Sequence, residues 1–418
     1  MVRTQSSGSN TRTVAILGAL DTKGAEFEFL KTEIEQRGHR TLVIDAGVLA
    51  PPPFSPDVSR EDVARAAGVE ISSLIEARDR GAAVAAMGRG AEAVVSQLYS
   101  GGRFDAIIGM GGSAGTAIGT QAMRALPLGV PKLMVSTLAG GDVTGFVGVK
   151  DIVMVPTVVD ISGLNRISRR VLAQAAGAIC GMAESRVRTT AEKALVSATM
   201  FGNTTDCVER ARARLEQAGY EVLVFHATGT GGRVMESLVE AGDIAGVLDV
   251  TTTEWADELI GGVLAAGPSR LEAAARSGTP AVIAPGCLDM VNFWAPETVP
   301  QKFASRRFYP HNPNVTLMRT TPEENAELGR LLSGKLNFSK GPVAVYLPLR
   351  GISVISAPGG PFYWPEADAA LFDALRRNLR PDIPVYEIDA NINDPVFADA
   401  VAQGLIEMLE SKKMRETV

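Results

Sequence analysis

The feature that most constrains the fold of this chain is the regular alternation of short apolar runs with amphipathic stretches of helix length. The apolar runs are nearly continuous, which is typical of parallel strands covered by helices on both faces. This alternation predicts an α/β protein with parallel sheets. In the first half we expect strands at 14–18, 41–45, 106–109, 133–136 and 152–155. In the second half we expect strands at 222–225, 246–250, 281–284, 315–318, 343–347 and 385–388.

The length of 418 residues predicts two domains, because a single hydrophobic core stops growing at a smaller size. A helical pattern over 165–189 is followed by a fresh α/β series from 194, so we place the boundary near residue 190. We expect two Rossmann-like subdomains, each with a parallel sheet, facing a central cleft. The predicted parts are a disordered tail at 1–12, subdomains at 13–190 and 191–410, and a charged tail at 411–418.

Composition excludes several classes of partner. The net charge is −6 with both signs interspersed, which argues against binding to nucleic acid. No apolar run reaches the length of a membrane span, and residues 1–10 lack the apolar core of a signal peptide, so we expect no membrane association. Cys180, Cys207 and Cys287 are odd in number and far apart, which argues against disulfides and against a zinc site, and fits the cytoplasm. We expect no resident metal site.

The strand at 106–109 runs into the sequence GMGGSAGT at residues 109–116, which then opens a helix. Backbone without Cβ atoms can approach a ligand closely, and a helix N-terminus favours an anion such as phosphate. The spacing is neither that of a Walker A motif nor G-x-G-x-x-G. The alternative is a glycine-rich turn that only lets the helix pack on its sheet. The candidate nucleotide-binding residues here are Gly111, Gly112, Ser113, Ala114, Gly115 and Thr116.

Two further polar loops follow strands that end at the same edge of the predicted sheet. In the first, Lys23 can place a charge on a phosphate and Asp21 can hold a ribose or a metal-bound water; alternatively Asp21 or Thr22 caps the next helix. One helix N-terminus contributes roughly 0.3–1 kcal/mol, whereas micromolar binding needs about 8 kcal/mol, so several loops must act together. The candidate nucleotide-binding residues are Asp21, Thr22 and Lys23 in the first loop, and Ser136, Thr137, Gly140 and Gly141 in the second.

The second half repeats this pattern with the sequence HATGTGGR at residues 226–233, which follows a strand and opens a helix. Such a loop can also hold an anion. His226 is a candidate catalytic base, and the alternative is a core histidine that hydrogen-bonds one backbone carbonyl. The candidate substrate-binding residues are Thr228, Gly229, Gly231, Gly232, Arg233 and, farther along the chain, Asn292.

Carboxylates provide two more catalytic candidates. Glu254 and Asp257 are one helical turn apart and can act as a pair, although Thr251 and Glu254 also have the spacing of a capping box. We favour the cap for Thr251 and keep Glu254 as a candidate. Asp289 lies two residues after Cys287 in a loop that follows a strand.

Cys287 and Arg319 also lie at strand ends. Cys287 with His226 as base would form a nucleophilic pair, but the sequence does not show that they meet. Arg319 is available for a carboxylate or a phosphate. Thr321 and Glu324, just after it, have the spacing of a second capping box. The candidate catalytic residues are thus His226, Glu254, Asp289 and Arg319.

Several of these runs occur in the same order in one known family. The matching runs are DTK at 21–23, GMGGS at 109–113, PTVVDI at 156–161, FHATG at 225–229, DVTTTE at 249–254, LDMVNF at 288–293 and LMRTT at 317–321. The chain resembles the Tm-1-like ATP-binding domain family, which comprises the N-terminal domain of a plant virus-resistance protein and bacterial relatives. The resemblance covers residues 13–409 and implies Mg-ATP on the first subdomain and a homodimer.

The chain departs from this family in two respects. Cys287 stands where the family has a small residue, which weakens it as a catalyst. The plant proteins continue into a TIM-barrel-like domain that this chain does not have up to Val418, so a separate barrel protein is a predicted partner.

Three functions follow as hypotheses. The first is an ATP-dependent enzyme, a kinase or ligase that acts on a small carboxylate held by the second subdomain. The second is a nucleotide-sensing module that regulates a partner without turnover. The third is an ATP-independent hydrolase or lyase for a keto acid.

Overall fold

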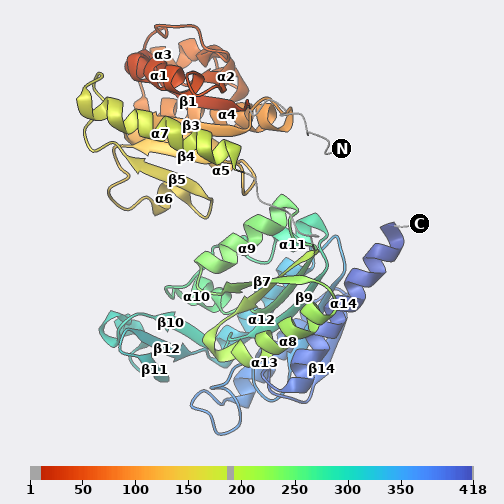
Figure 1. The fold of residues 1–418 in the computed structure, drawn as a ribbon. Coiled ribbons are helices and arrows are strands. Elements are labelled where there is room, and N and C mark those ends of the chain that lie inside the picture. Colours follow the sequence, from red (N-terminus) through yellow and green to blue (C-terminus); the bar gives the residue numbers. More distant parts are fainter. Residues whose placement is uncertain (1–10, 186–192, 417–418) are drawn as a thin grey trace, which may run out of the picture. The chain divides into compact units, whose positions relative to one another are not determined.

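The computed structural model describes residues 11–185 and 193–416. The chain divides into two compact units, residues 1–189 and 190–418, each with helices packed on a parallel sheet (Figure 1). The α/β class and the two Rossmann-like subdomains are therefore confirmed. Residues 1–10 of the predicted tail and the predicted boundary near residue 190 lie outside the described residues.

The first unit has a 5-stranded sheet in the order β2-β1-β3-β4-β5, in which every neighbouring pair is parallel. Its strands are β1 (Thr13–Gly18), β2 (Arg40–Asp45), β3 (Ala106–Gly111), β4 (Lys132–Ser136) and β5 (Ile152–Pro156). Each coincides with a predicted strand, because β1, β3 and β4 are almost fully buried and read as continuous apolar runs.

Helices cover both faces of this sheet (Figure 1). They are α1 (Leu20–Glu35), α2 (Arg60–Ala66), α3 (Ile71–Ala77), α4 (Arg80–Ser100), α5 (Ser113–Arg124), α6 (Thr144–Val147) and α7 (Arg166–Glu184). On one face α1 and α7 bury Phe27 and Ile179 against Ile16. On the other face α2, α4 and α5 share a core that contains Met87 and Leu17. Both faces of β1, β3 and β4 are thus withdrawn from water, whereas the edge strand β5 is partly exposed.

The second unit has a 6-stranded parallel sheet in the order β14-β13-β9-β8-β6-β7. Its strands are β6 (Leu195–Met200), β7 (Glu221–His226), β8 (Gly246–Thr251), β9 (Ala281–Gly286), β13 (Val343–Pro348) and β14 (Val385–Ile388). A separate antiparallel sheet has the order β10-β12-β11. It contains β10 (Met290–Phe293), β11 (Phe308–Asn312) and β12 (Val315–Arg319). The strand predicted at 315–318 therefore exists, but in this second sheet.

Helices also cover both faces of the larger sheet in the second unit. They are η1 (Gly202–Thr204), α8 (Thr205–Gln217), α9 (Thr230–Ala241), α10 (Glu254–Ile260), α11 (Ala273–Ser277), η2 (Pro296–Thr298), η3 (Gln301–Phe303), α12 (Pro322–Leu336), α13 (Pro365–Asn378) and α14 (Pro395–Glu416). Helices α8 and α14 pack Val208 and Leu405 on one face, and α12 and α13 pack Leu328 and Leu371 on the other. Because α14 continues to Glu416, the charged tail predicted from 411 is helical as far as it is described.

The two predicted capping boxes have opposite outcomes. Thr321 caps α12, since its hydroxyl accepts from the N–H of Glu324 at 3.2 Å and the Glu324 carboxylate accepts from the N–H of Thr321 at 2.8 Å. Thr251 caps no helix, because it is the last residue of β8 and its hydroxyl donates to the carbonyl of Thr199 at 2.9 Å. The cap expected at Thr251 is therefore wrong.

Across the described ranges, 11–185 and 193–416, no helix combines the length and the apolar character that a bilayer span requires.

Candidate functional site

The strand order of the first sheet reverses between β1 and β3. From β1 the chain passes to β2 on one side, and it then crosses to β3 on the other side. The loops that follow β1 and β3 lead to α1 and α5 on opposite faces of the sheet and leave a crevice between them. Parallel α/β sheets bind ligands at this point, so the sequence-predicted residues 21–23 and 111–116 lie where a ligand is expected.

At the N-terminus of α5, two backbone N–H groups have no partner among the residues that the structure describes. Gly112 is its N-cap residue, and no side chain caps the helix. Within the described residues, the N–H groups of Ser113 and Ala114 have no hydrogen-bond acceptor. Because the first N–H groups of a helix need an outside partner and carry partial positive charge, this terminus favours an anion.

Packing explains two glycines of this loop but not Gly112. A Cβ on Gly111 would lie 2.7 Å from the Cα of Gly115, and a Cβ on Gly115 would lie 3.2 Å from the carbonyl oxygen of Met110. A Cβ on Gly112 would have the hydroxyl oxygen of Thr137 as its nearest neighbour, at 3.7 Å, and its φ of −80° suits any residue. The missing Cβ at Gly112 therefore favours close approach by a ligand over the packing alternative.

Two of the predicted nucleotide-binding hydroxyls serve the fold instead. Thr116 and Ser136 are fully buried and hydrogen-bond each other at 2.7 Å, and the Ser136 hydroxyl also accepts from the N–H of Leu138 at 3.0 Å. Their assignment as ligand contacts is therefore corrected, because these hydroxyls join the first turn of α5 to the end of β4. Gly140 and Gly141, farther along the latter loop, are exposed.

Asp21 links the loop after β1 to the loop after β2. Its Oδ2 accepts hydrogen bonds from the N–H groups of Val48 at 2.9 Å and Leu49 at 2.7 Å. Its Oδ1 is buried and has no hydrogen-bond partner in the described part of the chain. Since α1 begins at Leu20 without a side-chain cap, the capping alternative for Asp21 and for the exposed Thr22 is wrong.

Lys23 interrupts the helical backbone of α1, with φ −135° and ψ 28°, and its Nζ donates to the carbonyl of Ile161 at 2.6 Å. In the same contact region, the Glu26 carboxylate accepts from the N–H of Gly163 at 2.6 Å. These bonds hold the loop after β5 against α1. The predicted contact of Lys23 with a phosphate is therefore replaced in this structure by a contact with the backbone.

A cavity of about 690 Å³ opens beside this crevice, a volume within the range of small-molecule sites. Its polar lining consists of Asp21 and Thr22 together with Arg78, Asp79 and Arg80, and its remaining wall comes from α3, α4, α5 and the loop after β2. A second hollow of about 640 Å³ also contains Asp21 and Thr22, and it continues over Lys23 and Asp160. The loop after β1 thus borders both hollows.

The candidate pair of Cys287 and His226 in the second unit does not form a catalytic site. His226 is exposed, and its ring lies against Phe201 with 5.5 Å between the ring centroids, so the alternative of a core histidine is wrong as well. Cys287 is fully buried, and burial raises the pKa of its thiol well above the ordinary value. A thiol that stays protonated is a poor nucleophile.

Glu254 occupies the anion-binding loop that precedes α9. Its carboxylate accepts hydrogen bonds from the N–H groups of Gly229 at 2.7 Å and Gly232 at 3.1 Å. A Cβ on Gly232 would lie 2.2 Å from the Glu254 carboxylate, and a Cβ on Gly231 would lie 1.9 Å from the carbonyl of His226. We predicted a role in substrate binding for Gly229, Gly231 and Gly232 and a role in catalysis for Glu254. Both predictions are corrected, because the loop binds the Glu254 carboxylate and thereby stabilises the fold. Thr228, which donates to the His226 carbonyl at 3.3 Å, and Arg233, which is exposed, complete this loop.

Arg270, which is not among the residues predicted from the sequence, fixes Glu254 in place. Its Nε donates to Glu254 at 2.7 Å, its Nη2 donates to Asp249 at 2.8 Å, and its Nη1 reaches Glu236 at 3.2 Å. Arg270, Asp249 and Glu254 are all fully buried. Arg270 lies in a loop 16 residues after Glu254, and no local pattern marks such a partner.

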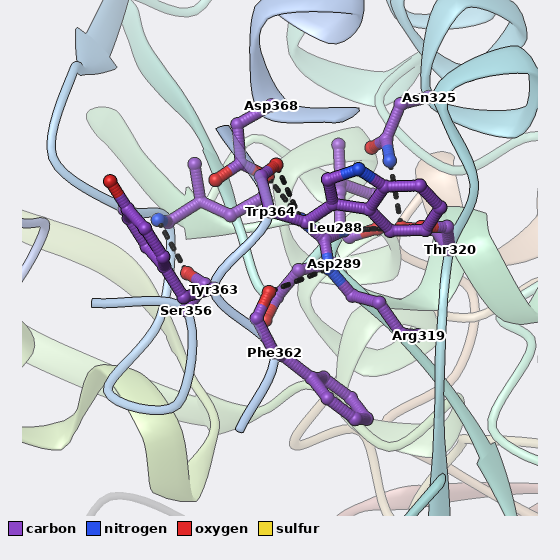
Figure 2. A network of polar contacts seen from close by, with 12 residues as sticks. Leu288, Asp289, Arg319, Thr320, Asn325, Ser356, Phe362, Tyr363, Trp364 and Asp368 are labelled. Atoms are coloured by element: carbon purple, nitrogen blue, oxygen red, sulfur yellow. Dashed lines mark hydrogen bonds and ion pairs between the residues drawn. The ribbon is translucent and has the colours of Figure 1, made fainter. Parts of the chain in front are cut away.

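Arg319 is also committed to an internal network (Figure 2). Its Nη2 pairs with the carboxylate of Asp368 at 2.6 Å, and its Nε donates to the carbonyl of Phe362 at 2.9 Å. Burial raises the pKa of Asp368 to about 7 despite this pairing. The prediction that Arg319 is available for a ligand is therefore corrected. Its guanidinium is fully buried and holds the segment before α13 in place.

Asp289 and Asn292 are fully buried beside the same loops. Asp289 accepts from the hydroxyl of Ser353 at 2.7 Å, and burial raises the pKa of its carboxyl. Asn292 donates its amide to Asp257 at 2.7 Å. Oδ1 of Asp289 and Oδ1 of Asn292 have no partner within the described residues. The second unit thus holds buried polar networks rather than an assembled set of the predicted catalytic groups.

No cluster of three or more histidine, cysteine, aspartate or glutamate side chains suited to a metal ion occurs in the described ranges.

Two family profiles match this chain, one for each unit. The UPF0261 N-terminal domain, described as an uncharacterised protein family, matches residues 12–188, and its C-terminal domain matches 193–409. The chain belongs to the UPF0261 family. A UPF0261 protein from Clostridium tetani (strain Massachusetts / E88) is 51% identical over 399 residues, which are 95% of this chain and 99% of that protein.

The chain is also similar to a plant protein, as its resemblance to the Tm-1-like family implies. The ToMV resistance protein Tm-1(GCR237) of Solanum lycopersicum is 42% identical over 337 residues, which are 79% of this chain and 45% of the tomato protein. A solved structure of UDP-N-acetylglucosamine 2-epimerase covers 89% of this chain and 92% of its own, with 11% identity and a TM-score of 0.21. A likeness that weak carries no argument about function.

Proposed function

We propose that the first unit of this UPF0261 protein binds ATP, with the triphosphate at the N-terminus of α5. The observation that carries this proposal is the pair of N–H groups of Ser113 and Ala114, which lack an acceptor within the described residues. They lie where the strand order reverses, beside a cavity of about 690 Å³. The glycine at position 112, which packing does not require, supports the same conclusion.

The energetics require the cavity as well as the helix terminus. The α5 terminus contributes roughly 0.3–1 kcal/mol toward an anion, whereas micromolar affinity needs about 8 kcal/mol. The additional contacts must come from the walls of the crevice, which are available on both sides of the loop after β1. The family resemblance supports ATP as the nucleotide.

Asp21 fits the magnesium ion that accompanies ATP. Its Oδ1 is buried without a hydrogen-bond partner in the described chain, and carboxylate oxygen is the ligand that magnesium prefers. Magnesium is usually held by one or two carboxylates together with phosphate oxygens and waters. Asp21 would hold the ion, which neutralises phosphate charge when bound, while Oδ2 of Asp21 keeps the loop after β2 in position.

The proposal does not extend to a small carboxylate substrate on the second unit. The glycine loop before α9 already binds Glu254, and Arg319 already binds Asp368. We also propose a cytoplasmic location, because Cys180, Cys207 and Cys287 are buried free thiols of a kind that a reducing compartment preserves.

Isothermal titration calorimetry of the full chain with ATP and magnesium tests this proposal. We expect a micromolar dissociation constant and a higher thermal unfolding temperature, since a ligand at 100 times its dissociation constant stabilises the native state by about 2.7 kcal/mol. The absence of both binding heat and a thermal shift at millimolar ATP would contradict it.

A further inference from the structure

The cavity beside the α5 terminus has a mostly apolar wall. Leu74 and Ile75 come from α3, Val84 and Met87 come from α4, and Ile118 comes from α5. Aliphatic side chains suit the faces of a flat ring, and a methionine sulfur makes favourable contacts with aromatic rings. A wall of this kind suits an uncharged planar group better than a phosphate.

Helix α3 is only partly covered. Its residues are partly buried or exposed, and Ile75, which lines the cavity, is 41% exposed. The chain reverses at each end of the helix through residues with positive φ, Gly68 at 77° and Arg78 at 50°. Ile71 and Leu74 pack against the core of the first unit, so Ile75 is the apolar side chain of α3 that a ligand in the cavity would cover.

The cavity is continuous with the proposed phosphate site. Ala114 and Gly115, in the first turn of α5, line it together with Asp21. A ligand that places an anion on the α5 terminus therefore extends its other end toward α3 and α4.

We propose that this cavity binds the base of the nucleotide, with Leu74 and Ile75 of α3 against one face of the ring and Met87 at the opposite wall. The inference rests on the proposed binding of ATP by the first unit, and it assigns the selectivity for a nucleoside over a bare polyphosphate to α3 and α4. Closure of α3 over the base would bury the exposed side chain of Ile75.

The test compares three ligands, Mg-ATP, adenosine and inorganic tripolyphosphate, by calorimetry on the full-length wild type and on Ile75→Asn. Because Ile75 is on the surface, the substitution is expected to leave the fold intact, and Val84→Asn repeats the test from the neighbouring helix. The matched control is Leu128→Asn, since Leu128 is 49% exposed and does not line this cavity. We expect Ile75→Asn to weaken ATP and adenosine about tenfold, as for loss of one buried aliphatic group, and to leave tripolyphosphate unchanged.

The outcomes separate this inference from the proposed function. If the wild type binds ATP, and Ile75→Asn and Val84→Asn bind it equally well, the base lies elsewhere and this inference alone is overturned. Equal weakening of ATP and tripolyphosphate also overturns it, because a base contact cannot affect a ligand without a base. If the wild type binds neither ATP nor tripolyphosphate, the proposed function itself fails.

Discussion

Replacing Glu254 with glutamine should destabilise the second unit by about 3 kcal/mol. The Glu254 carboxylate accepts from Gly229, Gly232 and Arg270 and is 1% exposed. Glutamine keeps one acceptor oxygen but turns an NH₂ group toward one of these donors. That leaves an unsatisfied buried donor, at about 1–3 kcal/mol, and removes one charge from a buried pair, whose loss typically costs about 3–5 kcal/mol. The unsatisfied donor is already part of the cost of breaking the pair, and Arg270 retains Asp249 and Glu236, so we take the low end of the second range, about 3 kcal/mol.

Tryptophan fluorescence measures this change in the second unit alone. The three tryptophans of the chain, Trp255, Trp294 and Trp364, all lie in that unit. With a urea m-value of about 2 kcal/mol per molar, a loss of about 3 kcal/mol lowers the unfolding midpoint by about 1.5 M.

The matched control is Asp389→Asn, which breaks the exposed ion pair with Arg350. Because solvent screens an exposed pair, its contribution to stability is small, and the unfolding midpoint of this control should hardly move. If Glu254→Gln behaved like this control, the carboxylate would not fill the glycine loop before α9. That loop would then be free for a substrate, and its assignment as structural would be refuted.

Two further predictions concern the pH dependence and the packing. Burial raises the pKa of Asp257 to about 7 from 3.8, so between pH 4 and 7 the unfolded chain releases a proton that the native state retains. The stability that this group contributes is fully present below pH 4 and falls by about 1.4 kcal/mol per pH unit up to pH 7. Asp368, whose pKa is also about 7, contributes a similar fall, so urea titrations of Asp257→Asn should show a shallower decline than the wild type. An equal decline in both proteins would contradict the assignment. Gly90→Ala should lower the thermal unfolding temperature of the first unit by the equivalent of about 1–3 kcal/mol, because its Cβ would lie 1.9 Å from the Val63 carbonyl of α2. The control is Gly181→Ala on α7, where an added Cβ would have open space. If circular dichroism gave Gly90→Ala and Gly181→Ala the same melting temperature, the close packing of Gly90 on α2 would be contradicted.

The sequence predicts the parallel strands well because their signal is local. A strand with both faces buried must be apolar throughout, and β3 and β9 show this directly. The position of the glycine loop at residues 111–116 was also predictable, since parallel strands bring their carboxyl ends to one edge. The capping box at Thr321 was also predicted correctly, because its hydrogen bonds join residues within one helical turn and the signal is therefore local.

The sequence did not predict what occupies the second glycine loop. Residues 226–233 look like an anion site, and they are one, but the anion is the chain's own Glu254, more than 20 residues away. Arg319 was predicted to be available for a ligand because its partner, Asp368, lies 49 residues farther along the chain and cannot be recognised from the local sequence. Pairing between distant charges depends on tertiary structure, and a single sequence carries no signal for it. The cleft between the subdomains, the homodimer and the separate barrel partner stay predictions.

The most direct test of the central claim is the affinity of Gly112→Ala for Mg-ATP, measured by calorimetry beside Gly181→Ala. A Cβ at position 112 has room within the protein, its nearest neighbour being the Thr137 hydroxyl oxygen at 3.7 Å, so stability should change by less than about 0.5 kcal/mol. If phosphate lies on the α5 terminus, this Cβ meets the ligand, and affinity should fall about tenfold, while Gly181→Ala binds like the wild type. Unchanged affinity in a folded Gly112→Ala protein would contradict the claim that this terminus binds the nucleotide.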